Sequence, residues 1–190
     1  MKMIYQPVQC KQLMDAEGKT VASAYRTHQQ IHPRGGWVEH NPIELWKNVC
    51  DLIQQVVDES HVQAGEIAGI GIANQGESVV MWDKQTGQPL YNVLVWQDTR
   101  TESSIQALIA ESETEVRQRT GLKLDSYFSA SKIQWLLNNV EKARSLLSDN
   151  RLVCGTLDTW LIWKMTEGRS FVTDVSSFLI FTHCNGMTGY

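Results

Sequence analysis

The apolar and polar residues in the centre of the chain predict three strands separated by polar turns. The apolar run at 67–72, spaced by glycines, predicts a strand buried on both faces. Two further strands are expected at 79–82 and 90–96, with the turn sequence Asp-Lys-Gln-Thr-Gly between them. Polar residues follow the first and third strands, around Glu77 and Trp96. Strand ends of this kind are where α/β folds place binding sites.

Elsewhere the pattern predicts a hairpin followed by helices. Leu13 to His28 is expected to form the hairpin, with Val21, Ala22 and Tyr25 as its apolar members. Asn41 can cap a helix that begins at Pro42. Its predicted apolar face consists of Trp46, Val49, Cys50, Ile53 and Val57. Other helices are expected at about 101–109, 113–119, 133–140 and 158–166, with strands at 151–154 and 171–181. These elements predict a mixed α/β chain.

Composition excludes function classes more than it identifies one. The 190 residues are 42% hydrophobic and 20% charged, which is the balance of a folded globular domain. The net charge of -4 argues against nucleic acid as a partner, because phosphate binding needs a basic face. No apolar run approaches the ~18 residues of a membrane helix, and no signal peptide is indicated. We therefore expect a cytoplasmic protein without a membrane partner.

Three residues are candidates for binding a small polyol. The carboxylate of Glu77 could accept hydrogen bonds from two adjacent hydroxyls, and the alternative is a solvated loop glutamate. The ring of Trp96 could cover the carbon skeleton of the ligand, or it could be a core tryptophan. The phenol of Tyr127 could donate a hydrogen bond, or its ring could plug the core from a loop. From spacing alone, the sequence indicates an α/β domain with a small-polyol site.

Other candidate chemistry is weaker. Asp98 and Arg100 could pair with each other or with a phosphate, and a surface ion pair is the simpler expectation. The four cysteines form no CxxC pair, so neither a zinc site nor a disulfide framework is indicated. Cys50 and Cys154 are expected in the core. No carboxylate–histidine cluster indicates a metal site, and the Gly-Gly pair before Trp37 lacks the spacing of a phosphate loop.

Several motifs in the same order carry a family resemblance. The central stretch contains IGIANQGESVVMW, DKQTGQPL and YNVLVWQDTRT. Before it come Pro33 and the segment GWVEHNP, and after it come LDSYFS at 124–129 and GTLDTWLIWK at 155–164. Over about 15–174, these motifs resemble those of the FGGY carbohydrate kinases, most closely the members that act on glycerol.

The resemblance implies a ribonuclease-H-like, actin-type α/β fold. The chain would be a single partial N-terminal domain over 1–190, incomplete at both ends and without the family's C-terminal domain. The resemblance also implies ATP- and Mg²⁺-dependent phosphoryl transfer to a terminal hydroxyl of glycerol or a related polyol. In these kinases an Arg-Glu pair, a tyrosine and a tryptophan hold the polyol, and these positions fall here on Gly76-Glu77, Tyr127 and Trp96.

The departures from the family pattern restrict what carries over. Gly76 replaces the arginine, so a guanidinium that donates to polyol oxygens is missing. Residues 3–10 read MIYQPVQC where the family has a D-x-G-T-T-S phosphate loop, and 175–178 depart from the N-A-S-R-T that follows Thr-Asp. The general-base aspartate and the nucleotide-gripping domain of the family lie beyond residue 190. We therefore assign no catalytic, cofactor-binding or metal-binding residue, and expect no kinase activity from the chain alone.

Three hypotheses follow from the sequence. The first is the N-terminal part of a polyol kinase, truncated or split, which would lack a C-terminal domain or a kinase subunit as its partner. The second is a non-catalytic module that binds a small polyol or pairs with a kinase subunit. The third is the same fold with a different acceptor, such as another polyol or a ketose, for which Gly76 would make room.

Overall fold

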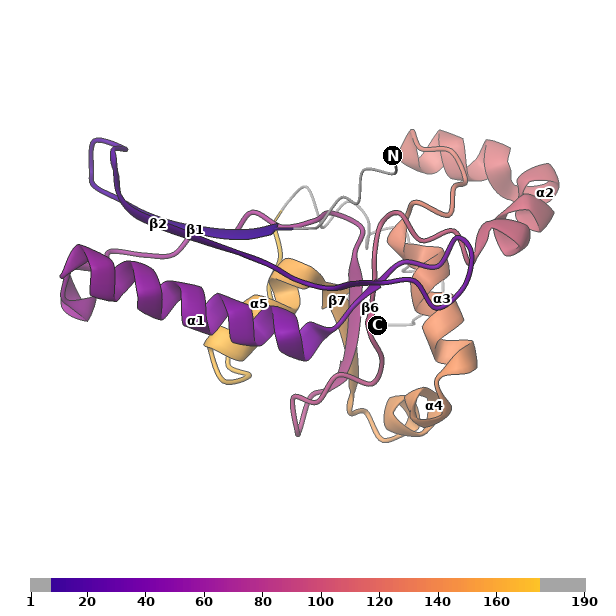
Figure 1. Cartoon of the computed structure of the whole chain (residues 1–190). Helices are drawn as coiled ribbons and strands as arrows, with labels where there is room; N and C mark the ends of the chain where they lie inside the picture. Colours follow the sequence, from indigo (N-terminus) through magenta and orange to yellow (C-terminus); the bar gives the residue numbers. More distant parts are fainter. Residues whose placement is uncertain (1–7, 175–190) are drawn as a thin grey trace. The chain divides into compact units, whose positions relative to one another are not determined.

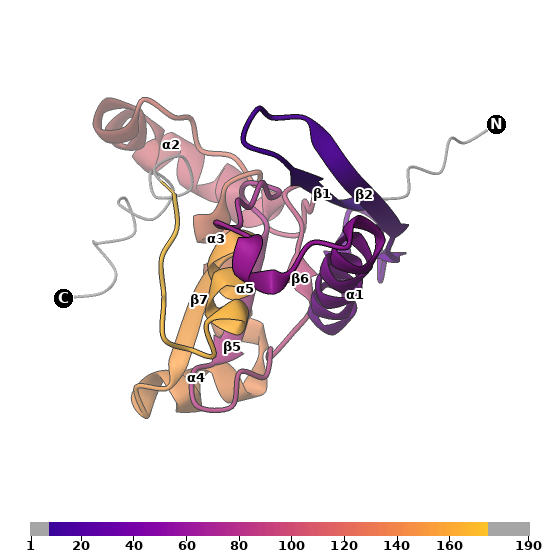
Figure 2. The ribbon, with the colours of Figure 1, turned by 90° about the vertical axis from the view of Figure 1, so that its left-hand side faces the viewer.

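The computed structural model describes residues 8–174, and of Val8 only the backbone. Within these residues the chain forms two compact units, which we describe separately. Unit 1 comprises residues up to 30 and 40–72, and unit 2 comprises 31–39 and 73 onward. Figures 1 and 2 show the helices and strands of both units in two views. The expectation of one partial domain over 1–190 stays a prediction.

Unit 1 is a hairpin with one helix packed along it. Strands β1 (Val8–Met14) and β2 (Thr20–Thr27) pair antiparallel, which confirms the predicted hairpin. Helix α1 (Pro42–Ser60) contacts both strands, and Figure 1 shows it running along the hairpin. The buried residues that these elements share are Ala24, Leu52 and Val56. Of the three predicted apolar members, Ala22 packs against this cluster, whereas Val21 and Tyr25 are exposed.

Helix α1 begins as predicted but buries a different stripe. Asn41 Oδ1 accepts hydrogen bonds from the backbone N of Ile43 at 2.9 Å and of Glu44 at 3.3 Å. The buried residues are Pro42, Leu45, Asn48, Val49, Leu52 and Val56, whereas Cys50 of the predicted face is exposed. Two neighbouring stripes of this helix are apolar at helical spacing, so packing against the hairpin decides which one is buried.

The predicted strand at 67–72 does not form. No residue of this run is assigned to a strand, and Ile70 is 62% exposed. A strand needs at least one neighbouring strand to satisfy its backbone hydrogen bonds, and the described residues pair none with this run. Its glycines also lower the intrinsic preference for strand structure.

Unit 2 is built on strand β5 (Val79–Asp83). It pairs antiparallel with β6 (Val93–Leu94) on one side and with β7 (Leu152–Thr156) on the other. With the two-residue strands β3 (Gln30–Ile31) and β4 (Glu39–His40), the strand order of the sheet is β3-β4-β6-β5-β7. The predicted strands at 79–82 and 151–154 are confirmed, and the one at 90–96 is shorter than expected.

Helices cover both faces of strand β5. Helices α3 (Ser129–Asn139) and α4 (Glu141–Ser148) pack on the face that carries Met81. Helix α5 (Leu157–Met165) packs on the opposite face, which carries Trp82. Figure 1 shows α3 and α4 on one side of these strands and α5 on the other. The mixed α/β architecture expected from the sequence is therefore present.

The remaining helices and the last predicted strand agree only in part with the predictions. Helix α2 (Glu102–Thr120) is one helix where two were predicted, and it ends as expected before Gly121, which has a φ of 74°. Helix α4 was not predicted, because residues 141–148 are mostly polar. The predicted helix at 158–166 is confirmed. Of the predicted strand at 171–181, residues 171–174 are irregular and the remainder lies outside the described residues.

Candidate functional site

Glu77 occupies a strained turn immediately before β5. Its backbone φ is 63°, in the left-handed region, where a residue with a side chain costs roughly 1–2 kcal/mol relative to a right-handed conformation. The residue is only 5% exposed. Glu77 is therefore not a solvated loop glutamate. Strain held at one position by its surroundings is a feature that functional sites often have.

The carboxylate of Glu77 is fixed by Ser129, the first residue of α3. Its Oε2 accepts a hydrogen bond from the Ser129 backbone N at 2.7 Å and from the Ser129 Oγ at 2.6 Å. The first N–H groups of a helix have no partner within the helix and attract negative charge, so a carboxylate is stabilised at this position. This contact joins the turn before β5 to the loop that carries Tyr127.

Trp96 and Tyr127 lie against each other. Their ring centroids are 5.8 Å apart at an angle of 65°, and the two residues are 39% and 42% exposed. The backbone N of Trp96 donates to the Oγ of Ser78, the residue that follows Glu77, at 3.2 Å. Neither aromatic residue is in the core, so the alternatives of a core tryptophan and a plugging tyrosine are wrong. Together they present aromatic surface to solvent.

The three candidate residues are thus brought into one part of unit 2. Ser78, which follows Glu77, accepts a hydrogen bond from the Trp96 backbone, and the Trp96 ring contacts the Tyr127 ring. Ser129, two residues after Tyr127, donates hydrogen bonds to Glu77. A Cβ added at Gly76 would meet no atom within 4 Å, so a larger side chain has space at this position. The position that the family resemblance assigns to an arginine is therefore open.

Lys132 on α3 is a feature of this site that the sequence analysis missed. Its side chain is fully buried, and its Nζ donates to the backbone carbonyls of Ser126 at 2.6 Å, Tyr127 at 2.7 Å and Phe128 at 3.4 Å. Burial lowers the pKa of Lys132 to about 8, while the charge of Glu77 opposes this shift. A lone lysine on an amphipathic helix is ordinarily a surface residue, so its position gave no signal.

Asp98 and Arg100 form a buried pair, whereas a surface pair was expected. Arg100 Nε donates to Asp98 Oδ1 at 2.8 Å, and its Nη2 donates to Asp98 Oδ2 at 2.8 Å and to Glu39 at 2.6 Å. The guanidinium stacks on the rings of Trp37 and Trp135. Burial alone would lower the pKa of Arg100, but the hydrogen bonds to both carboxylates raise it above its usual value. The guanidinium of Arg100 is buried and already bound by the carboxylates of Asp98 and Glu39, which leaves it unsuited to binding a phosphate.

The buried pair also holds the segment after β6. Asp98 Oδ2 accepts a hydrogen bond from the backbone N of Val38 at 2.7 Å, and Asp98 Oδ1 accepts one from the N of Arg100 at 3.0 Å. These bonds fix the backbone two residues beyond Trp96. They stabilise the scaffold on which the exposed Trp96 ring is presented.

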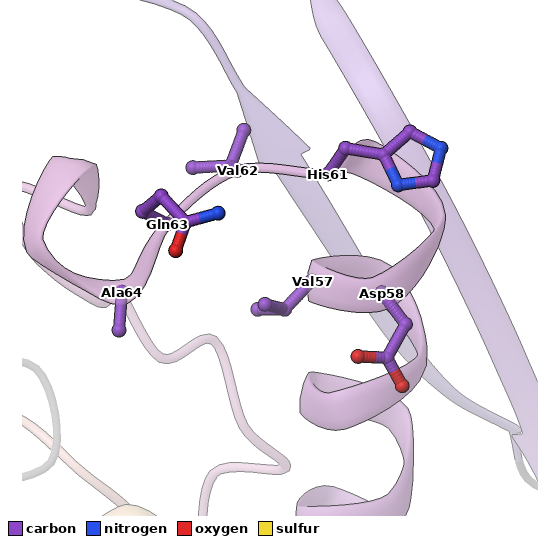
Figure 3. A pocket seen from close by; sticks show the side chains of 6 residues that line it. All are labelled: Val57, Asp58, His61, Val62, Gln63 and Ala64. Atoms are coloured by element: carbon purple, nitrogen blue, oxygen red, sulfur yellow. The ribbon is translucent and has the colours of Figure 1, made fainter.

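A pocket of about 330 Å³ lies in unit 1, between the end of α1 and the short 3-10 helix η1 (Ala64–Glu66). Figure 3 shows the six residues that line it, which are Val57, Asp58, His61, Val62, Gln63 and Ala64. None of the candidate polyol-binding residues lines this pocket. Over residues 8–174, no group of three or more His, Cys, Asp or Glu side chains is placed to hold a metal ion. Nor does any described helix combine the length and apolarity needed to cross a membrane.

A family model gives this geometry a context. Residues 11–179 match the N-terminal domain of the FGGY family of carbohydrate kinases. The chain belongs to this FGGY family. The match spans both units and includes every residue of the candidate site. The resemblance drawn from the motifs is therefore confirmed.

The similar FGGY proteins include several glycerol kinases. The glycerol kinase of Bacillus subtilis is 47% identical over 166 residues, which are 87% of this chain and 34% of that protein. The glycerol kinase of Mycoplasmopsis pulmonis is 44% identical over 170 residues, which are 88% of this chain and 34% of that protein. The chain thus spans about a third of the length of these relatives.

Solved structures of FGGY kinases confirm the fold. The chain is similar to Plasmodium falciparum glycerol kinase, solved with ADP, with a TM-score of 0.85 and 35% identity over 92% of this chain and 35% of that one. The gluconate kinase of Lactobacillus acidophilus gives a TM-score of 0.78 at 21% identity over 91% of this chain and 33% of that one, and it supports the fold alone. The α/β, actin-type fold of the FGGY N-terminal domain is the one expected from the motifs.

Proposed function

We propose that this chain contains the acceptor-binding part of an ATP-dependent kinase that phosphorylates a terminal hydroxyl of glycerol or a similar polyol. The observation that carries this proposal is the convergence of Glu77, Trp96 and Tyr127, which come from separate segments of unit 2. Family membership and the similarity to glycerol kinases support the same substrate class.

Each of the three residues has a distinct role in this proposal. Ser129 engages Oε2 of Glu77, which leaves Oε1 to accept hydrogen bonds from polyol hydroxyls. The Tyr127 phenol donates to a polyol oxygen. The Trp96 ring covers the C–H surface of the carbon chain. Charged acceptors and aromatic faces are well matched to a small molecule that has hydroxyls on one side and C–H groups on the other.

The described residues do not fit the phosphate donor. In these residues no cluster of acidic or histidine side chains could hold Mg²⁺, and residues 8–10 belong to strand β1 rather than to a phosphate-binding loop. We therefore assign ATP and Mg²⁺ to no residue here, and derive no step of the transfer through them. Such a kinase would require another part of the protein, corresponding to the rest of the relatives' length, to provide the nucleotide site.

Calorimetric titration of glycerol into the 190-residue chain tests the proposal. We expect saturable binding that is lost in Glu77→Ala, with propane-1,3-diol, which lacks the vicinal hydroxyl, binding more weakly. Tyr25→Phe, at an exposed position of the hairpin in unit 1, should bind as the unaltered chain does. Equal heats from the unaltered chain and Glu77→Ala would remove Glu77 from the site. Absence of any heat would refute polyol binding by this chain.

The space at Gly76 supports a second acceptor class. Because a Cβ added at this position would meet nothing within 4 Å, there is open space beside Gly76 into which a polyol or ketose longer than glycerol could extend. A titration series of glycerol, a pentitol and a ketopentose distinguishes the two classes. Tighter binding of the five-carbon ligands would favour the larger acceptor.

A further inference from the structure

Lys132 makes an unusual set of contacts for a lysine. Its Nζ reaches three consecutive backbone carbonyls, those of Ser126, Tyr127 and Phe128, at 2.6, 2.7 and 3.4 Å. The side chain comes from the first turn of α3 and is fully buried. An ammonium group has three N–H donors and no acceptor, so three carbonyls match its bonding capacity. These hydrogen bonds hold the backbone of Tyr127 and of the residue on either side of it.

Other contacts also hold the loop around Tyr127. The Tyr127 backbone N donates to Asp125 Oδ1 at 2.9 Å, the Ser126 Oγ donates to Glu102 at 2.7 Å, and the Ser131 Oγ donates to the Phe128 carbonyl at 3.4 Å. The Tyr127 ring lies against two aromatic neighbours, Trp96 and Phe128. Lys132 contacts all three carbonyls at once, so a change in its bonding would rotate the peptide planes on both sides of Tyr127.

We propose that Lys132 is a positioning residue of the polyol site, whose ammonium group sets the loop backbone so that Tyr127 lies against Trp96. This inference rests on the proposed function for its ligand, but the loop geometry it describes can be measured without any ligand. Lys132 does not touch the polyol. It acts through Tyr127.

The charge state of Lys132 gives the proposal a measurable signature. Four charged groups act on the ammonium group of Lys132 through their electrostatic fields. They are Glu77 from the turn before β5, Asp98 and Arg100 from the segment after β6, and Asp125 from the loop itself. Burial outweighs the three carboxylates and lowers the pKa of Lys132 to about 8. A neutral amine keeps two N–H donors and directs a lone pair at the third carbonyl. One of the three bonds is therefore lost as the pH rises through this value.

The test uses the full chain labelled with 5-fluorotryptophan, in which Trp96→Phe assigns the Trp96 ¹⁹F resonance. The pH is raised from about 6.5 to about 9.5, on either side of the Lys132 pKa. Glycerol affinity is measured in parallel by calorimetry. The variants are Lys132→Met, which keeps the length of the side chain but no donor, and Lys142→Met, which removes an exposed lysine from α4.

We expect the Trp96 resonance to move with a midpoint near pH 8 in the unaltered chain and in Lys142→Met, and to show no such transition in Lys132→Met. Glycerol affinity should be about tenfold weaker in Lys132→Met at neutral pH. If the ¹⁹F chemical shift of Trp96 in the unaltered chain does not change with pH, the proposal is overturned, even if Lys132→Met fails to fold. So would unchanged affinity in a folded Lys132→Met.

The two proposals fail in different ways. If the unaltered chain binds no glycerol while Trp96 still reports the titration of Lys132, the polyol function is wrong and the positioning of the loop stands. If glycerol binds but neither the resonance nor the affinity depends on Lys132, the function stands and the positioning role is wrong.

Discussion

Ser129 donates both its backbone N–H and its hydroxyl to one oxygen of Glu77, across a sequence separation of 52 residues. The two bonds offset the cost of burying a carboxylate and of holding Glu77 at a positive φ. They also leave the second carboxylate oxygen in a fixed direction. A loop residue that would otherwise be solvated is thereby made rigid.

Loss of this contact should destabilise the chain. Ser129→Ala removes one hydrogen bond to a charged group, and we expect the free energy of unfolding to fall by roughly 1.5–3 kcal/mol. Urea unfolding measures this value. Ser104→Ala on the exposed side of α2 is the control and should change the free energy by less than about 0.5 kcal/mol. A double-mutant cycle with Glu77→Gln that gives no coupling energy would contradict the contact.

Gly76→Arg should tighten polyol binding. Gly76 is outside the set of positive-φ residues in the described chain, and an added Cβ meets nothing within 4 Å, so the substitution introduces no strain. A guanidinium at this position adds donors for polyol oxygens, and we expect glycerol affinity to rise about tenfold. Gly76→Ala is the matched control and should leave the affinity unchanged. Weaker glycerol binding in Gly76→Arg than in Gly76→Ala would contradict the prediction.

Tyr127→Phe should separate the contribution of the Tyr127 hydroxyl to glycerol binding from that of the ring. The exposed ring keeps its contact with Trp96, so the free energy of unfolding should change little. The lost donor should weaken glycerol binding by roughly three- to tenfold, as measured by calorimetry. Binding that survives in Tyr127→Phe but is lost in Tyr127→Ala would assign the ring, rather than the hydroxyl, to the ligand.

Stability should increase with pH in the range where Lys132 titrates. Its pKa is about 8 in the folded chain against 10.5 in the unfolded chain, so between these values the unfolded state binds more protons. The free energy of unfolding should therefore rise with pH across this range, by up to about 3 kcal/mol relative to Lys132→Met. Denaturant titrations of both proteins at several pH values test the sign. A difference that falls with pH would mean that the folded state favours the ammonium.

Arg100 should be the most sensitive position of the scaffold. Arg100→Ala leaves the carboxylates of Asp98 and Glu39 buried without their cation, and removing one partner of a buried pair costs roughly 3–5 kcal/mol. Arg100→Lys keeps the charge but loses the bidentate geometry and the stacking on Trp37, so its loss should be intermediate. Thermal unfolding orders the three proteins, and equal melting temperatures would contradict this ranking.

The sequence predicted best the elements that have strong local signals. The turn at 83–87, strand β5 and the cap of α1 follow from local chemistry, because turn residues, alternation and an asparagine before proline act over a few positions. The family resemblance then gave Glu77, Trp96 and Tyr127 as the candidate polyol-binding positions, which stay a prediction. Their convergence is a tertiary fact, which no local pattern contains.

What the sequence did not predict depends on contacts that are formed only in the folded chain. The run at 67–72 has the composition of a buried strand but pairs with none in the described structure. Lys132 and Arg100 are of residue types that usually lie on the surface, yet both are buried. Three backbone carbonyls bind the ammonium group of Lys132, and two carboxylates and two indole rings surround the guanidinium of Arg100. Burial of a charge is decided by the groups that compensate it, and their orientation depends on the fold even where they are near in sequence.

The link between Glu77 and Ser129 also has a consequence for synthesis. A nascent chain that has emerged only as far as residue 120 already carries Glu77 and Trp96, but it holds neither the serine that fixes the carboxylate nor Tyr127. Closing so long a loop is an unfavourable step that only later contacts can compensate. Ligand recognition should therefore arise abruptly, when α3 leaves the ribosome, and arrested chains of graded length would reveal the point at which it appears.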